Sequence, residues 1–321
     1  MKSRRTMLSR RELVLSAGLV ALTWRGGGKW RWGQDASPYA LVLGTAQDGG
    51  VPQLSCYTPR CARARREPQY VTSLALVHPQ RDRYYLVDAS PDITRQVDLI
   101  PAAGFRARAA ARRPFDGIFL THAHIGHYLG LALLGREGVG MQETPVYGTP
   151  RMRTYLSTNG PWSLMVDEGR IVFPDVPVDT VFEVDEWLSA RMMPVPHRPE
   201  FSDTVGWLFR GPSGSVLYLP DIDRWEEWQY PVADIVRAVD VSLIDGSFYS
   251  AEEVPGRRIE DIPHPLIPHT MDLLEGTVRD GARVVFTHFN NTNPAPDGGE
   301  ETGKIRRRGF EIAQQGMRFP L

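Results

Sequence analysis

The residues best suited to chemistry in this chain are three histidines that follow one short apolar stretch. His122, His124 and His127 lie within six residues, although the whole chain of 321 residues holds only eight histidines. They come directly after residues 118–120, an apolar run typical of a buried strand. Alternate residues of an extended segment point the same way, so His122 and His124 can face one ion. Imidazole is a favoured ligand of zinc and iron, and the spacing therefore predicts a metal site.

The same arrangement recurs further along the chain, where other apolar strands end in a histidine or an aspartate. The residues that follow such strands are His197, Asp221, Asp245 and His288. Ligands gathered at the strand ends of one sheet edge describe a metal site on a rigid scaffold. Asp88 also follows a strand and could support a ligand, but a turn or helix-cap aspartate is the favoured interpretation.

The segments between these residues alternate between strand and helix patterns. Predicted strands cover 39–44, 72–77, 84–88, 118–120, 145–147, 171–173, 181–184, 190–195, 207–209, 216–219, 241–244 and 283–286. Predicted helices cover 93–113 with a break near Pro101, 129–136, 151–158, 235–239 and 271–280. Residues 159–163 are expected to form a turn, and residues 255–270 a proline-rich loop.

The composition is that of a soluble globular enzyme. Hydrophobic residues make up 42% of the chain and charged residues 23%. Without residues 1–36, basic residues fall from 37 to 29 and acidic residues from 38 to 36, which leaves a net charge of −7. A mildly acidic body without a basic stripe argues against nucleic acid as a partner and leaves a small molecule as the expected substrate.

Residues 1–36 are predicted to be an export signal that is separate from the folded domain, residues 37–321. Five basic residues precede residues 13–24, a twelve-residue apolar stretch that is too short to span a bilayer comfortably. Residues 9–14, Ser-Arg-Arg-Glu-Leu-Val, resemble a twin-arginine export motif. We expect a periplasmic protein that meets the membrane only through this segment; a basic tail with an amphipathic helix is the alternative.

Three motifs make the chain similar to a known family. They are Thr-His-Ala-His-Ile-Gly-His at 121–127, Gly-Thr-Ala-Gln-Asp-Gly-Gly-Val-Pro-Gln at 44–53 and His-Phe-Asn-Asn-Thr-Asn-Pro at 288–294. From residue 39 to the C-terminus the chain resembles the metallo-β-lactamase superfamily. The branch it resembles includes the B-type protein of pyrroloquinoline quinone biosynthesis and is similar to phosphonate-pathway cyclic phosphodiesterases and ribonuclease Z. The resemblance implies an α/β (α+β) fold, a four-layer αββα sandwich of two mixed sheets.

The resemblance also implies two metal positions. The first would use His122, His124 and His197, with Asp221 as a bridging ligand. His127 and His288 would remain for the second, but the aspartate of the family signature is Gly126 in this chain. The second position should then bind weakly unless another carboxylate substitutes, and the candidates are Asp48, Asp223 and Asp245. We expect one or two zinc ions, with iron or manganese as alternatives.

Three residues are predicted to act in catalysis: Asp221 at the metal, and Asp245 with His264 as general acid and orienting group. For Asp245 a capped turn, and for His264 a purely structural place between two prolines, are the alternatives. Trp162 and residues 290–291 could line the pocket, with core packing and turn formation as equally good readings.

Cys56 and Cys61 leave three possibilities: a disulfide, half of a zinc site, or free thiols. The similar branch carries a C-x-C-x-x-C zinc pattern, in which Thr58 here replaces the middle cysteine. A site that lacks one thiolate should bind zinc poorly. In an exported protein we therefore favour a disulfide or a relic of a metal site.

Three functions compete. The favoured one is a metal-dependent hydrolase of a small ester, phosphodiester or related substrate, which acts through metal-bound hydroxide. The second is a metal-binding accessory or carrier protein for a quinone-type cofactor, without turnover. The third is a mononuclear iron oxygenase on the same fold. Restoring the signature carboxylate with Gly126→Asp would distinguish the first two.

Overall fold

The computed structural model describes residues 37–100, 103–254, 256 and 263–321. The predicted export segment, the break at Pro101 and most of the first half of the predicted loop 255–270 lie outside the described residues. Among those that are described, no helix is both long enough and apolar enough to cross a membrane.

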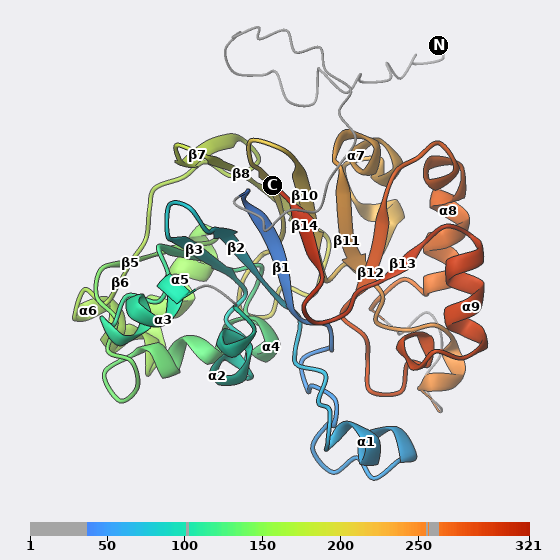
Figure 1. Ribbon diagram of the computed structural model, residues 1–321, viewed down its shortest axis with the longest axis horizontal. Helices are drawn as coiled ribbons and strands as arrows, with labels where there is room; N and C mark the ends of the chain where they lie inside the picture. Colours follow the sequence, from blue (N-terminus) through green and yellow to red (C-terminus); the bar gives the residue numbers. More distant parts are fainter. Residues whose placement is uncertain (1–36, 101–102, 255, 257–262) are drawn as a thin grey trace, which may run out of the picture.

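Two seven-stranded sheets stack face to face and form the centre of the molecule (Figure 1). In sheet order, the first contains β14 (Arg318–Pro320), β1 (Tyr39–Gly44), β2 (Ser73–His78), β3 (Arg83–Val87), β4 (Gly117–Phe119), β5 (Thr144–Tyr147) and β6 (Ile171–Val172). The second contains β13 (Glu311–Ile312), β12 (Val284–Thr287), β11 (Val241–Asp245), β10 (Ser215–Leu219), β9 (Thr204–Arg210), β8 (Leu188–Val195) and β7 (Val181–Asp185). Both sheets mix parallel and antiparallel pairs.

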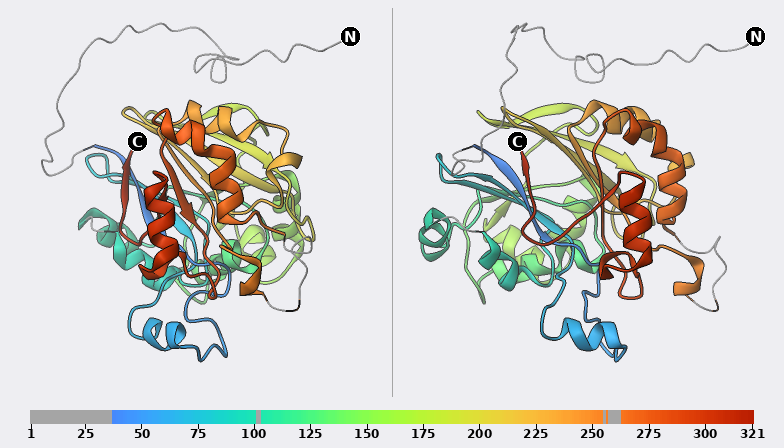
Figure 2. Two further views of the ribbon diagram at one scale, coloured as in Figure 1. Left: turned by 90° about the vertical axis from the view of Figure 1, so that its right-hand side faces the viewer. Right: turned by 45° about the vertical axis from the view of Figure 1, so that its right-hand side comes forward.

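Helices cover the outer face of each sheet and complete the four layers (Figure 2). The first sheet is covered by α2 (Ile93–Gln96), α3 (Ala103–Ala110), α4 (Ile125–Tyr128), α5 (Pro150–Thr158) and α6 (Trp162–Asp167). The second is covered by α7 (Val232–Ala238), α8 (Ile267–Arg279) and α9 (Glu300–Arg307). The predicted αββα sandwich is confirmed.

The core between the sheets is aromatic and pins the histidine strand in place. The Phe119 ring at the end of β4 lies 4.5 Å from Tyr147 and 5.0 Å from Trp207, measured between centroids. The buried Trp207 indole donates to the carbonyl of Leu120 over 3.0 Å. Burial of these rings therefore fixes the backbone immediately before His122.

Strand direction brings the predicted site residues to one edge of the sandwich. β3, β4 and β5 are parallel, as are β10, β11 and β12, so each set ends at a common edge. The two sheets meet at that edge, where a bridge pairs Ala46 after β1 with Phe289 after β12. The backbone N–H of Val205 also donates to the carbonyl of Thr121 over 3.0 Å. The edge is therefore held by both sheets.

Some predicted elements differ in the structure. The loop expected at 255–270 ends early, because α8 already begins at Ile267. Where a helix is expected at 129–136, the chain forms a 3₁₀ helix at Leu129–Leu134, directly after the α-turn α4. Gly130 packs closely in this segment, because a Cβ there would lie 2.9 Å from the carbonyl oxygen of Ala89. The turn expected at 159–163 ends early, since Trp162 already begins α6. β9 and β10 pair as an antiparallel hairpin.

A small arm projects from the body between β1 and β2 and carries α1 (Pro59–Ala64) (Figure 1). A disulfide joins Cys56 to Cys61, which decides among the three possibilities for these thiols. The Thr58 hydroxyl, at the position of the middle cysteine in the similar branch, accepts a hydrogen bond from the Cys61 N–H and caps α1.

Candidate metal centre

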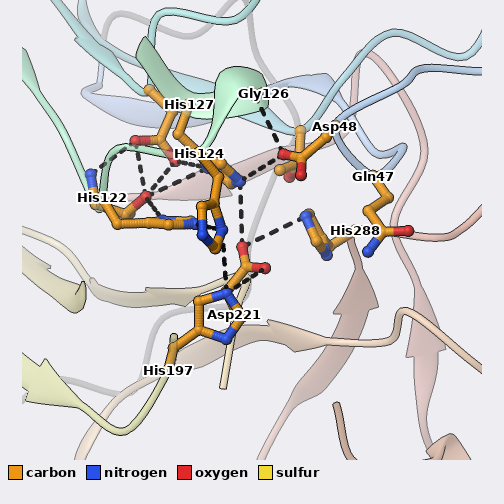
Figure 3. Close-up of polar contacts among 12 residues, drawn as sticks. Gln47, Asp48, His122, His124, Gly126, His127, His197, Asp221 and His288 are labelled. Carbon is orange, nitrogen blue, oxygen red and sulfur yellow. Dashed lines mark hydrogen bonds and ion pairs between the residues drawn. The ribbon is translucent and has the colours of Figure 1, made fainter. Parts of the chain in front are cut away.

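Three predicted ligands converge in a first group at the common edge (Figure 3). The Nδ1 atom of His124 lies 2.8 Å from Nε2 of His122 and 3.3 Å from Nε2 of His197. His197 Nε2 is 3.6 Å from Oδ1 of Asp221. His122 and His197 come from different sheets, so the group forms only when the sandwich is assembled.

A second group lies on the other side of Asp221. The Asp221 Oδ2 atom is 3.2 Å from Nε2 of His127 and 3.3 Å from Nε2 of His288. Oδ1 of Asp48 lies 3.4 Å from the same His127 nitrogen. Asp221 therefore faces both groups, as expected for a bridging ligand. Of the three carboxylates that could replace the signature aspartate, Asp48 is the one that reaches the second group.

Each of the five histidines is oriented by an oxygen atom at the ring nitrogen that faces away from the site. The pairs are His122 Nδ1 with Thr121 Oγ1 at 3.0 Å, His124 Nε2 with Glu200 Oε2 at 3.1 Å, His127 Nδ1 with Asp88 Oδ2 at 2.7 Å, His197 Nδ1 with Asp223 Oδ1 at 2.7 Å, and His288 Nδ1 with Ser247 Oγ at 2.8 Å. A proton held at the outer nitrogen leaves the inner one with a free lone pair. This is the usual support of metal-binding histidines.

Three buried polar atoms point into the second group and lie close to one another, but none of them makes a contact with hydrogen-bond geometry. They are Nε2 of His127, Oδ2 of Asp221 and Nε2 of His288. Leaving one such group unsatisfied costs roughly 1–3 kcal/mol, and folded proteins rarely tolerate several together. Three adjacent ones made of imidazole and carboxylate are the donor set that a divalent cation satisfies. The described residues therefore fit a metal ion.

At most positions the electrostatics of the site favour the form that binds a metal, which is a neutral imidazole or an ionised carboxylate. Burial lowers the pKa of His122 well below its ordinary value, so its imidazole is neutral. Burial alone would raise the pKa of Asp221, but His288 and His127 outweigh it and hold that pKa well below the ordinary value. His127 behaves differently, because the carboxylates of Asp88 and Asp221 overcome burial and raise its pKa. A metal ion would have to displace that proton.

Asp88 corrects one expectation from the sequence. It was predicted to cap a turn, yet its fully buried carboxylate accepts a hydrogen bond from the Thr121 N–H over 2.8 Å and holds His127. Asp223 corrects another, since it orients His197 in the first group and does not reach the second. Both aspartates follow strands, and the chain alone does not show which histidine each one meets.

The predicted pair Asp245 and His264 is brought together beside the second group. Oδ2 of Asp245 lies 2.7 Å from Nδ1 of His264, and both side chains are buried. Burial lowers the pKa of His264, but the Asp245 charge outweighs it and raises that pKa above its ordinary value. A ligand-type atom of His264 is within 4.8 Å of those of Asp221 and His288. The pair is thus close enough to exchange a proton with a group at the site.

The residues that could line the pocket have the alternative roles considered for them. Trp162 packs in the core against Tyr128, with ring centroids 4.8 Å apart. The Asn290 amide donates to the Thr292 hydroxyl over 2.7 Å and shapes a turn. The sequence did not single out three of the residues that orient the histidines: Thr121, Glu200 and Ser247. Thr121 directly precedes His122, and Ser247 follows Asp245 by two residues, so their positions gave a local signal.

Comparisons with known proteins agree with this architecture. Residues 83–289 match the model of the β-lactamase superfamily domain. Coenzyme PQQ synthesis protein B of Methylobacterium radiotolerans is 29% identical over 316 residues, which cover 88% of this chain and 99% of that protein.

Solved structures are similar over the same part of the chain. Zn²⁺-bound PqqB from Methylobacterium extorquens superposes with a TM-score of 0.74 at 23% identity and covers 88% of this chain and 100% of its own. A diphosphatase of the PhnP family gives a TM-score of 0.62 at 19% identity, with coverages of 88% and 97%. At these identities the structural likeness concerns the fold.

Proposed function

The chain belongs to the β-lactamase superfamily, and from that premise we propose that it is a metal-dependent hydrolase of a small ester, phosphodiester or related molecule. The observation that carries the proposal is the convergence of five oriented histidines on one bridging aspartate. A site that served only to hold the fold together would not need inward lone pairs or an arrangement of two groups on either side of Asp221.

The first group would hold the ion. His122, His124 and His197 supply three imidazole nitrogens. Asp221, whose Oδ1 lies 3.6 Å from Nε2 of His197, supplies the negative charge. A bound divalent metal would lower the pKa of a coordinated water to roughly 7 and polarise the substrate. The relatives named above support zinc as that metal, since one of them is a zinc-bound protein.

His264 would supply a proton to the leaving group. Its Nδ1–H donates to Asp245, which fixes the ring. Nε2, which lies 3.5 Å from the side-chain nitrogen of Gln47, would turn to the substrate in place of that contact. The raised pKa of His264 favours the protonated ring that this role requires. Asp245 acts through His264 and is therefore a positioning residue.

Two exposed apolar side chains stand next to site residues and would contact an apolar part of the substrate. Ile125 directly follows His124 and is 55% exposed, and Phe201 directly follows Glu200 and is 56% exposed. Exposed large apolar groups beside a polar site are a common feature of ligand entrances. They favour an aromatic or aliphatic leaving group.

Hydrolysis of aryl esters, aryl phosphodiesters and a chromogenic lactam by the zinc-loaded full chain tests this proposal. We expect turnover of at least one class, a loss of roughly 10²-fold or more in kcat for His264→Gln, and unchanged zinc content in that variant. His124→Ala should lose turnover together with the zinc ion of the first group. No turnover of any class by zinc-, manganese- or iron-loaded protein would overturn the proposal.

A second candidate rests on the extent of similarity to coenzyme PQQ synthesis protein B, which spans 88% of this chain. In that case the chain would bind a quinone-type cofactor without turnover. Titration of the metal-loaded protein with pyrroloquinoline quinone, followed by tryptophan fluorescence, measures this directly. Saturable binding that disappears in His124→Ala, together with no hydrolysis, would favour this candidate.

Export is also proposed. The disulfide of the arm supports it, because such bonds persist in oxidising compartments, and residues 1–36 have the composition of a signal. Fractionation of cells that express the chain should place it in the periplasm, and Arg10→Lys with Arg11→Lys should retain it in the cytoplasm. Cytoplasmic location of the unaltered chain would contradict export.

A further inference from the structure

The second group has a complete ligand set even though the family signature lost its aspartate at Gly126. Four side chains make up this group: His127, His288, Asp221 and Asp48 (Figure 3). His127 lies within 3.4 Å of Asp48 and 3.2 Å of Asp221, and Asp221 lies 3.3 Å from His288. Asp48 comes from the loop after β1, about 80 residues away from the signature in the chain. The ligand atoms of Asp48, His127 and His288 all lie within 4.8 Å of one another.

Asp48 occupies the space that a side chain at position 126 would need. The Gly126 N–H donates to Oδ1 of Asp48 over 3.2 Å. A Cβ at Gly126 would overlap that same oxygen and would lie 2.8 Å from the Asp48 Cα atom. Gly126 has ordinary helical geometry in α4 and needs no glycine for its backbone. The glycine is therefore explained by the approach of Asp48.

The loop that carries Asp48 is held against the site before any ligand arrives. The Gln47 N–H donates to the carbonyl of Phe289 over 2.9 Å, next to His288. The Gly50 N–H donates to the carbonyl of Gln47 over 2.8 Å, and Gly50 has φ of +65°, which closes the turn around Asp48. The carboxylate is thus preorganised and costs little entropy on binding.

We propose that Asp48 replaces the missing signature aspartate and completes a second divalent-metal site with His127, His288 and the bridging Asp221. Two imidazoles and two carboxylates suit zinc, manganese or iron(II). The inward Nε2 atoms of His127 and His288, buried and without hydrogen bonds, are the lone pairs that this second ion would use. The inference deepens the proposed function, since it makes the centre binuclear.

Metal content separates this inference from the question of activity. The full chain is loaded with zinc, desalted and analysed for zinc per chain, with cobalt(II) absorption as a second readout. We expect two ions in the unaltered chain and one in Asp48→Asn, an isosteric change that keeps the hydrogen-bonding shape. Asp203→Asn, at an exposed carboxylate paired with Arg151, is the matched control and should keep two ions.

Double variants identify which ion is lost. Asp48→Asn combined with His288→Ala should still hold one ion, because both changes strike the same site. Asp48→Asn combined with His124→Ala should hold none. Two ions in Asp48→Asn, or one ion in both the unaltered chain and Asp48→Asn, would overturn the inference. These counts do not depend on turnover, so a chain that hydrolyses nothing could still confirm the second site.

Discussion

At the scale of single residues, the outer hydrogen bonds of the histidines decide how well the site is formed. Asp88 and Asp223 are the two carboxylates among these partners that lie 2.7 Å from their histidine nitrogen. Asp88 fixes the ring of His127 in the second group, and Asp223 fixes the ring of His197 in the first group. Because a carboxylate both orients imidazole and increases its basicity, these two aspartates should tune metal affinity without touching the metal.

Asp88→Asn should weaken the ion held by His127 roughly 10- to 100-fold. The amide keeps the shape of the carboxylate but loses its charge at a fully buried position. Competition of the protein with a chromophoric zinc chelator measures the affinity of each ion, and Asp223→Asn is the matched change for the other group. Equal affinities in Asp88→Asn and the unaltered chain would show that this hydrogen bond has no part in metal binding.

Gly126→Asp should fail to add a metal ion, contrary to what the sequence alone suggests. The new Cβ would lie 2.8 Å from the Asp48 Cα atom, so the loop after β1 would have to move. We expect a lower melting temperature and no more than the original zinc content. A gain of one ion per chain with unchanged stability would mean that Asp48 does not hold the second site.

The residues that the sequence identifies are those with a local signal. His122, His124 and His127 stand together, and His197, Asp221 and His288 each follow an apolar strand. Asp48 was only one of three candidate carboxylates, because which aspartate meets His127 depends on how two distant loops pack. The same holds for Glu200, whose contact with His124 is made across 76 residues.

At the scale of elements, the strand pattern and α5 are predictable from the sequence, whereas the 3₁₀ helix after α4 is not. Buried strands such as β1 and β11 have apolar runs bounded by polar residues, and the predicted and observed limits agree within one residue. The 3₁₀ helix at Leu129–Leu134 carries the same apolar spacing as an α-helix. Gly130 lies against the backbone of Ala89 and Ser90, and that contact is tertiary.

The disulfide arm is an element that should be separable from the site. Cys56 and Cys61 close a loop with a sequence separation of only 5, for which chain entropy gives at most about 2 kcal/mol of stabilisation. The variant Cys56→Ser with Cys61→Ser should therefore make the arm more sensitive to protease and leave zinc content unchanged. Loss of zinc in this variant would show that the arm supports the loop of Asp48.

At the scale of the whole molecule, the site exists only because two sheets are packed together. Trp207 of β9 is fully buried between them, and its indole N–H binds the carbonyl of Leu120, two residues before His122. The first sheet supplies His122 and the second supplies His197 and His288. Packing between the sheets and metal binding should therefore be coupled.

Trp207→Ala should lower the free energy of unfolding by roughly 3–5 kcal/mol, because it leaves a large cavity in the core. It also removes the hydrogen bond to Leu120, so zinc affinity should fall with stability. Trp207→Phe keeps most of the packing and is the matched control, with a smaller loss of both. Chemical unfolding with and without zinc measures the coupling; equal stabilisation by zinc in all three proteins would contradict it.

The measurement that tests the central claim most directly is anomalous X-ray diffraction at the zinc edge from crystals of the zinc-loaded chain. The structure predicts two peaks at the common edge of the sheets. One should lie among His122, His124 and His197, the other between His127, His288 and Asp48, with Asp221 touching both. No peak at this edge would contradict the metal centre itself, and a single peak at the first group would contradict the role of Asp48.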